Sequence, residues 1–313
     1  MPDKNLKQII IRLIKWILIA LILYFIYRQI SAQWEQVKEY DWTINWIYFV
    51  LSIIILQIGL FYKSYLWSRV LACFGTHLPP MRAFKVAYLS NLGRYVPGKI
   101  VQFAGIMYLA RKEGVREDVA VSSFALTQLF DTPAGIIAVF LYYFLLGTSY
   151  DKISNYLPLT IVLGAVSILG IAVIMVPALL ERTLNLMLRV IRKPALEFKL
   201  EKKIGFGFLF LYFIAWNIFG FSFYLFLQAV AEVPVNYFAE ACFIYTAAYL
   251  IGYWALFAPG GIGVREGVMG ALLYEVGGVI KSVAYTVGLA ARLWFFIGEI
   301  TITFLALMVR SRE

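Results

Sequence analysis

The chain has 313 residues, 62% of them hydrophobic, and a mean hydropathy of +0.79. A soluble domain is nearer half apolar, so this composition excludes an ordinary soluble protein and indicates an integral membrane protein. The formal net charge of +10 would suggest nucleic-acid binding in a soluble protein. In a membrane protein it is typical of cationic cytoplasmic loops that set the orientation, and we expect no nucleic-acid partner.

The sequence gives little sign of catalysis. His77 is the only histidine, and Cys73 and Cys242 lie in or beside apolar runs. These residues predict neither a zinc site nor a disulfide framework. No Gly-x-Ser-x-Gly, His-Glu-x-x-His or P-loop motif occurs, and Gly261-Ile262-Gly263 lacks the surroundings of a dinucleotide fingerprint. We therefore expect no metal, no cofactor and no catalytic residues, and do not expect an enzyme.

The first half of the chain predicts three spans. Basic residues precede an apolar run that ends near Tyr27. This run is too long for a cleaved signal peptide, so it would be the first span, with a cytoplasmic N-terminus. The second span would cover residues 45–65 and return to the cytoplasm at Lys63 and Arg69. The third span would cover residues 119–146.

The segment at residues 82–112 is interrupted by the sequence NLGRYVPGK at residues 91–99. Neither half is long enough to cross a bilayer. Basic residues stand at both ends, so we predict a helical hairpin that enters and leaves the membrane on the cytoplasmic side. A pair of amphipathic helices on the membrane surface is the alternative.

The second half repeats this order. The fourth span would cover residues 157–180, a strongly basic loop follows, and the fifth span would cover residues 204–229. The last span, residues 282–309, ends in Arg310 and Arg312 and should finish inside. Residues 236–281 must then begin and end outside, as a second hairpin with the sequence PGGIGVREG at its tip.

The whole pattern predicts an all-α integral membrane protein with about six spanning helices and two re-entrant helical hairpins. It would be a single transmembrane domain with residues 1–150 and 157–313 as the halves of an inverted-topology repeat. Transporters with such repeats place interrupted helices at the substrate site. Irregular backbone at membrane depth is tolerated only where protein covers it or it lines a watery cavity.

The two breaks form a candidate anion site. Helix N-termini that follow a break present free N–H groups and a positive dipole, and arginine and lysine fit phosphate. Arg94 and Lys99 could instead be ordinary cytoplasmic charges, and Arg265 could pair locally with Glu266. The predicted substrate-binding residues are Arg94, Tyr95, Pro97, Gly98, Lys99, Pro259, Gly260, Gly261, Arg265 and Glu266.

Three further charges are candidates for gating or charge pairing. Asp131 lies inside the third span, and Arg292 and Glu299 lie seven residues apart on one face of the last span. Unpaired charges in a membrane are expensive, so we expect partners. Arg292 could pair with Asp131 or with Glu266. A structural ion pair that joins the halves is the alternative to a role in transport.

The sequences of the two breaks resemble the signatures of the lysylphosphatidylglycerol synthase/flippase transmembrane family. Asp131 stands where that family tends to place an acidic residue. The resemblance implies a membrane module that moves aminoacylated phospholipid between leaflets. Some members carry a cytoplasmic synthase domain. This sequence reaches Glu313 without one, so we expect a stand-alone membrane module and assign no aminoacyl transfer.

Together, the residues and the resemblance predict translocation of a lipid with a phosphate headgroup across a bacterial or archaeal plasma membrane. The lipid could be an aminoacylated or anionic phospholipid or a polyprenyl-phosphate-linked lipid, and both termini should be cytoplasmic. The alternative is an accessory subunit of a lipid-linked glycosyltransferase or lipid-modifying enzyme, with a separately encoded synthase or glycosyltransferase as partner. The sequence is compatible with a homo-oligomer.

Overall fold

The computed structural model describes residues 43–95, 100–146, 157–190, 192–231, 233–255 and 258–310. Every regular element in these ranges is a helix, as predicted. The predicted first span lies outside the described residues. In chain order the elements are α3 (Trp46–Cys73), α4 (Pro80–Asn91), η1 (Leu92–Tyr95), α5 (Ile100–Lys112), α6 (Glu117–Leu145), α8 (Leu157–Met175), α9 (Pro177–Val190), α10 (Lys202–Val230), α11 (Phe238–Trp254), η4 (Pro259–Gly261), α12 (Val264–Glu275) and α13 (Lys281–Met308).

The outer surface of this helical bundle is apolar. Large side chains such as Ile47 on α3, Phe210 on α10, and Ile300 and Phe304 on α13 are mostly exposed. Such surfaces are rare on soluble monomers, but they match lipid tails. Among the described helices, α3, α6, α10 and α13 are long and apolar enough to cross a membrane, and α8 with α9 would make five. The protein is therefore a multi-pass membrane protein.

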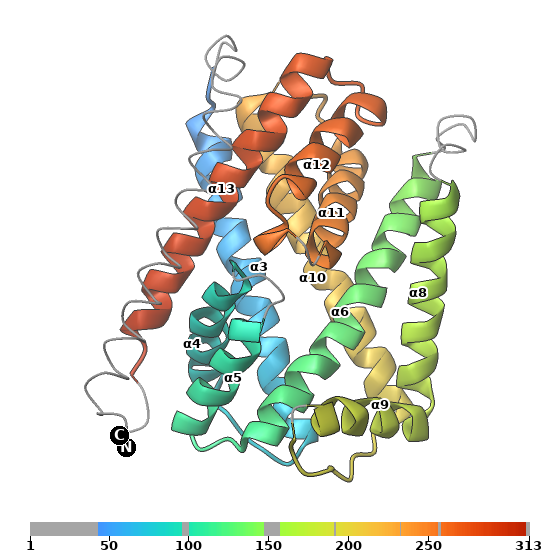
Figure 1. Cartoon of the computed structure of the whole chain (residues 1–313). Coiled ribbons are helices and arrows are strands. Elements are labelled where there is room, and N and C mark those ends of the chain that lie inside the picture. Colours follow the sequence, from blue (N-terminus) through green and yellow to red (C-terminus); the bar gives the residue numbers. More distant parts are fainter. Residues whose placement is uncertain are drawn as a thin grey trace.

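The predicted fourth span differs in its course. It was expected to continue to residue 180, but α8 ends at Met175 and the chain bends by 105° before α9. Pro177 explains the end of α8, because proline lacks an N–H and clashes with the carbonyl four residues earlier. The new helix buries Leu180, Leu184 and Leu188, and it lies across the ends of the longer helices (Figure 1).

Helix α3 is longer than the predicted second span. Asn45 caps it by accepting hydrogen bonds from two backbone N–H groups of the first turn, a common way to start a helix. Beyond residue 65 the helix continues to Cys73 and buries Trp67 and Leu71. Lys63 therefore lies within the helix and not at its end, which corrects the prediction.

The two interrupted segments form two pairs of short helices. α4 packs against α5, and α11 packs against α12. The α4–α5 pair occupies the lower half of the bundle in Figure 1 and the α11–α12 pair the upper half. The breaks η1 and η4 contact each other. We call η1 the first tip, and η4 with the start of α12 the second tip. The two tips consequently meet inside the bundle, between the long helices α3, α6, α10 and α13.

Glycine makes this close approach feasible. Gly261 has φ +71°, and a Cβ placed there would lie 2.7 Å from the carbonyl oxygen of Gly252 on α11. A Cβ on Gly93 would lie 2.5 Å from the backbone nitrogen of Gln102 on α5. Only a residue without a side chain tolerates this φ and these distances readily. Both tips are thus fitted tightly to their own helix pair.

Around the tips the bundle is filled by aromatic side chains. Phe130, Trp216, Phe223 and Trp294 are almost completely buried in the main core. A smaller core beneath the α4–α5 pair includes Trp67. Large rings bury much apolar surface each, so these contacts stabilise the packing of the long helices around the meeting point of the breaks.

Candidate functional site

A cavity of about 130 Å³ lies where α3, α4, α6, α10, α11 and α13 meet. A water molecule occupies about 30 Å³ of the liquid, so several waters fit. The wall combines aromatic rings with charged and amide groups, as ligand sites usually do. A smaller cavity of about 30 Å³ borders Arg94, Arg265 and the backbone of η4, and it shares Arg94, Tyr249 and Tyr253 with the larger one.

Lys63 and Asp131 form an ion pair in the larger cavity. The ammonium nitrogen Nζ lies 2.7 Å from Oδ1 and donates to Oδ2 at 2.8 Å. It also lies 4.2 Å from the ring centre of Trp216, 5.1 Å from that of Phe219 and 5.9 Å from that of Tyr249. Within about 6 Å, such rings attract a cation. Lys63 therefore sits in a cage of one carboxylate and three rings.

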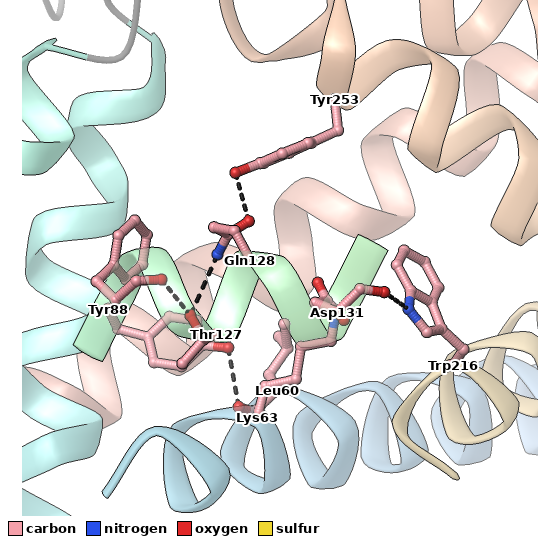
Figure 2. A network of polar contacts seen from close by, with 9 residues as sticks. Leu60, Lys63, Tyr88, Thr127, Gln128, Asp131, Trp216 and Tyr253 are labelled. Atoms are coloured by element: carbon pink, nitrogen blue, oxygen red, sulfur yellow. Dashed lines mark hydrogen bonds and ion pairs between the residues drawn. The ribbon is translucent and has the colours of Figure 1, made fainter. Parts of the chain in front are cut away.

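Hydrogen bonds join the helices around this cavity (Figure 2). The Tyr253 hydroxyl on α11 donates to Gln128 Oε1 on α6 at 2.5 Å. The Tyr88 hydroxyl on α4 donates to the carbonyl of Leu60 on α3 at 2.9 Å. Trp216 Nε1 on α10 donates to the carbonyl of Asp131 at 2.9 Å. Together with the Lys63–Asp131 ion pair, these contacts join five helices, α3, α4, α6, α10 and α11.

Arg94 in η1 forms an ion pair with Glu299 on α13. Both side chains are largely buried, with 13% and 9% exposed, and the guanidinium lies 5.5 Å from the ring centre of Phe295. The alternative that Arg94 is an ordinary cytoplasmic surface charge is therefore wrong. Its ion pair connects the first tip to the last long helix.

Arg292 on α13 holds the second tip. Its Nη1 lies 3.3 Å from Glu266 Oε1 and donates to the carbonyl of Gly260 at 3.1 Å. Glu266 Oε2 accepts the N–H of Gly263 at 2.6 Å, where α12 begins. Of the two pairings considered for Arg292, the structure has the one with Glu266. The pairing with Asp131 is wrong, because Asp131 faces Lys63.

Arg265 differs from the other charged residues of the site because it lies among aromatic rings and not beside a described carboxylate. Its side chain is buried, with 7% exposed, and it lies among rings, 4.4 Å from the centre of Phe295, 4.5 Å from that of Tyr249 and 5.2 Å from that of Tyr245. Within the described ranges no carboxylate lies within ion-pair distance of it. A local pair with Glu266 does not form, since consecutive helical residues do not face each other.

The position of Arg265 adds to the positive potential. It is the second residue of α12 after the cap Gly263. The first N–H groups of a helix are free, and the helix dipole places partial positive charge there. The guanidinium and the helix end therefore act in the same direction. An anion in the small cavity between Arg94 and Arg265 would meet both.

The structure places the predicted residues in three groups. Arg94, Gly260, Gly261 and Arg265 border the small cavity, and Asp131 borders the large one. Tyr95 is the last residue of η1 and Pro259 the first of η4, whereas Glu266, Arg292 and Glu299 lie behind the lining as ion-pair partners. The predicted residues Pro97, Gly98 and Lys99 lie outside the described part of the chain.

The cage around Lys63 was not predicted. Lys63 was assigned to a helix end, although Leu66, Trp67, Val70 and Leu71 continue the apolar helical period beyond it. That period was the available signal. Trp216 and Tyr249 carried none, because aromatic residues are abundant throughout the chain. Across the described residues, no three His, Cys, Asp or Glu side chains lie close enough together to hold a metal ion.

The fold and the site define a multi-pass helical membrane protein with a polar cavity where two pairs of broken helices meet. Residues 11–302 match the lysylphosphatidylglycerol synthase TM region, and the chain belongs to this family. No match was found among curated proteins or among solved structures. The family match confirms the resemblance seen in the two break sequences, and it fits a lipid-related role in the membrane.

Proposed function

We propose that this protein moves a lipid with a phosphate headgroup between the leaflets of a bacterial or archaeal plasma membrane. The headgroup would occupy the space between η1 and η4, and the acyl chains would remain in the bilayer. In this proposal the α4–α5 and α11–α12 pairs are re-entrant hairpins of an inverted repeat, entering from opposite sides of the membrane, and both termini are cytoplasmic.

The observation that carries the proposal is the buried Arg265. Burying a charge is costly unless a partner compensates it. This guanidinium lies against aromatic rings and within hydrogen-bonding reach of the Tyr245 hydroxyl, but it has no carboxylate partner within the described ranges. A phosphate would supply the missing charge. Arginine binds phosphate through two parallel hydrogen bonds, and the start of α12 adds free N–H groups.

The charged residues around the cavities favour the binding of one anion. Four basic residues, Lys63, Arg94, Arg265 and Arg292, stand against three acidic ones, Asp131, Glu266 and Glu299. Three ion pairs account for all but Arg265. The described site therefore carries one net positive charge, which the single negative charge of a phosphodiester would balance.

Reconstitution tests this function directly. Purified protein is placed in liposomes that contain a fluorescent anionic phospholipid, and a membrane-impermeant quencher reports the loss of outer-leaflet lipid. The wild type should exchange the lipid between leaflets far faster than protein-free vesicles do. Exchange at the protein-free rate, for anionic, aminoacylated and polyprenyl-phosphate lipids alike, would overturn the proposal.

The variant Arg265→Gln should lower this exchange at least about tenfold, a loss that corresponds to about 1.4 kcal/mol. Arg189→Gln on α9 is the matched control, because Arg189 is exposed and lies away from both cavities. Arg94 is a less direct test than Arg265. Its replacement would leave the buried Glu299 without the guanidinium that faces it, and this would affect folding as well as binding.

A further inference from the structure

The cage around Lys63 has the composition of an ammonium-binding site. Proteins recognise ammonium groups with aromatic faces and with carboxylates. Asp131 supplies the carboxylate, and Trp216, Phe219 and Tyr249 supply the rings. The cage borders the larger cavity, which shares Arg94, Tyr249 and Tyr253 with the smaller cavity beside Arg265, where the phosphate of the proposed headgroup would lie.

The Trp216 ring of the cage is held in place independently of the lysine. The Trp216 ring is fixed by its hydrogen bond to the carbonyl of Asp131. It also packs directly on α6, where a Cβ on Gly135 would lie only 2.7 Å from the ring. Trp216 is 1% exposed. Its orientation therefore depends on α6 and not on Lys63, so the ring would keep its place if the lysine were shortened.

In this chain the cage is occupied from within. Lys63 comes from α3, and Asp131 comes from α6, which packs against α3 (Figure 2). An ammonium attached to the protein binds as an intramolecular ligand, at an effective concentration in the millimolar range for a short flexible tether. A free amine in solution below this concentration would compete poorly with it. The position that could bind a substrate amine is therefore already taken.

The charge balance points in the same direction. With Lys63 in the cage, the described site carries one net positive charge at Arg265. A phosphate headgroup without an amine neutralises this charge. A headgroup with a phosphate and an amine brings no net negative charge, and it would leave one positive charge unbalanced at membrane depth, which is expensive.

We infer that Lys63 is a specificity-determining residue: its ammonium takes the place of a substrate amine, so that the cavity selects an anionic phosphate headgroup without an amine. This inference rests on the proposed function and narrows its substrate class. It assigns a role to a residue that no break sequence contains, and it separates this chain from a protein whose cavity would accept an aminoacylated lipid.

The first test uses the wild-type protein in a competition between two lipids in liposomes. Equal amounts of a fluorescent anionic phospholipid and its aminoacylated form are exchanged by the wild-type protein. The amine-free lipid should move at least about tenfold faster, since an unbalanced charge at membrane depth costs a few kcal/mol or more. Faster exchange of the aminoacylated lipid, or equal rates for the two, would overturn the inference while leaving the proposed function intact.

The second test empties the ammonium position with Lys63→Met, which keeps an unbranched side chain but ends one atom short of the position of the ammonium nitrogen and carries no charge. n-Butylammonium, added to purified protein in detergent, should bind this variant at least about tenfold more tightly than the wild type. n-Butanol should bind the two equally. In liposomes the variant should shift its preference toward the aminoacylated lipid by a similar factor.

Two further variants keep this test decisive. Lys199→Met, at an exposed position, should gain no affinity for n-butylammonium. The double variant Lys63→Met with Asp131→Asn removes the unpaired carboxylate and should lose the gained affinity. The binding arm needs no transport, so it tests the cage even if no lipid moves. Suppose that the Lys63→Met protein exchanges lipid but gains neither affinity for the amine nor a changed lipid preference. That result would overturn the inference about Lys63 and leave the proposed function intact.

Discussion

The two tips each bring an arginine to the ring of Phe295, but the two arginines have different partners. Arg94 lies 5.5 Å from the ring centre and pairs with Glu299. Arg265 lies 4.4 Å from it, and the described residues provide no carboxylate for it. The difference arises in α13, which offers an acid to the first tip and a base, Arg292, to the second.

This arrangement shows that similar break sequences need not have equal roles. Arg292 and Glu299 are seven residues apart, about 10 Å along a helix axis, so each reaches a different tip. Arg292 takes up Glu266, the one acid of the second tip, and leaves Arg265 uncompensated. The first tip is held by a balanced ion pair, whereas the second carries an arginine that no described carboxylate neutralises.

The largest expected effect concerns the first tip. Glu299→Gln would leave Arg94 buried without its carboxylate, and breaking such a pair typically costs about 3–5 kcal/mol of folding free energy. Unfolding of the purified protein in detergent measures the loss. The double variant Arg94→Gln with Glu299→Gln should recover part of it. If Glu299→Gln unfolds at the wild-type midpoint, the first tip is not held by this pair and the comparison fails.

Backbone strain should come next, at the second tip. Gly261→Ala places a Cβ at φ +71° and 2.7 Å from a carbonyl oxygen, which should cost about 3 kcal/mol through strain and overpacking. The same unfolding measurement applies. Gly267→Ala on the neighbouring helix is the control, because a Cβ there meets nothing within 4 Å. Equal stability of the two variants would contradict the tight fit of this tip.

The arginines themselves should differ under a conservative change. Arg265→Lys keeps the charge but loses the planar guanidinium, which stacks on rings and binds phosphate through two parallel hydrogen bonds. Lipid exchange should therefore fall about tenfold. Arg94→Lys keeps an ion pair with Glu299 and should lower exchange less. Exchange rates in liposomes decide between them. A larger loss for Arg94→Lys would reverse the roles assigned to the two tips.

The smallest effect is expected in the hydrogen bonds around the cavity. Tyr253→Phe removes the bond to Gln128 and should lower stability by about 1 kcal/mol. The matched control is Tyr274→Phe, since Tyr274 is 46% exposed and should tolerate the change. Because this bond joins α11 to α6, a stability loss in the control but not in Tyr253→Phe would mean that the second tip is positioned by other contacts.

Much of the fold could be predicted from local signals. Apolar runs predicted the long helices α6, α10 and α13 nearly to their ends, and the proline and glycine clusters predicted both breaks. Proline also had an effect that was missed, since Pro177 ends α8 five residues before the expected end of the span. Such residues act on their own stretch of chain, so their consequences are present in the sequence.

The partners of the charges could not be predicted in the same way. Lys63 was placed at a helix end, and Asp131 was considered as a partner for Arg292, until the packing of α3 against α6 brought Lys63 to Asp131. Helical spacing tells which residues share a face, but not which helix that face meets or at what depth.

The sequence by itself determined that this is a helical membrane protein of its family, broken at two glycine-rich points with basic residues nearby. Only the tertiary structure decided that the breaks touch each other, that Lys63 fills an aromatic cage, and that Arg265 alone among the described cavity charges lacks a carboxylate. Composition and backbone breaks follow from neighbouring residues in the chain. Charge compensation depends on distances between helices far apart in sequence, and these are set when the bundle packs.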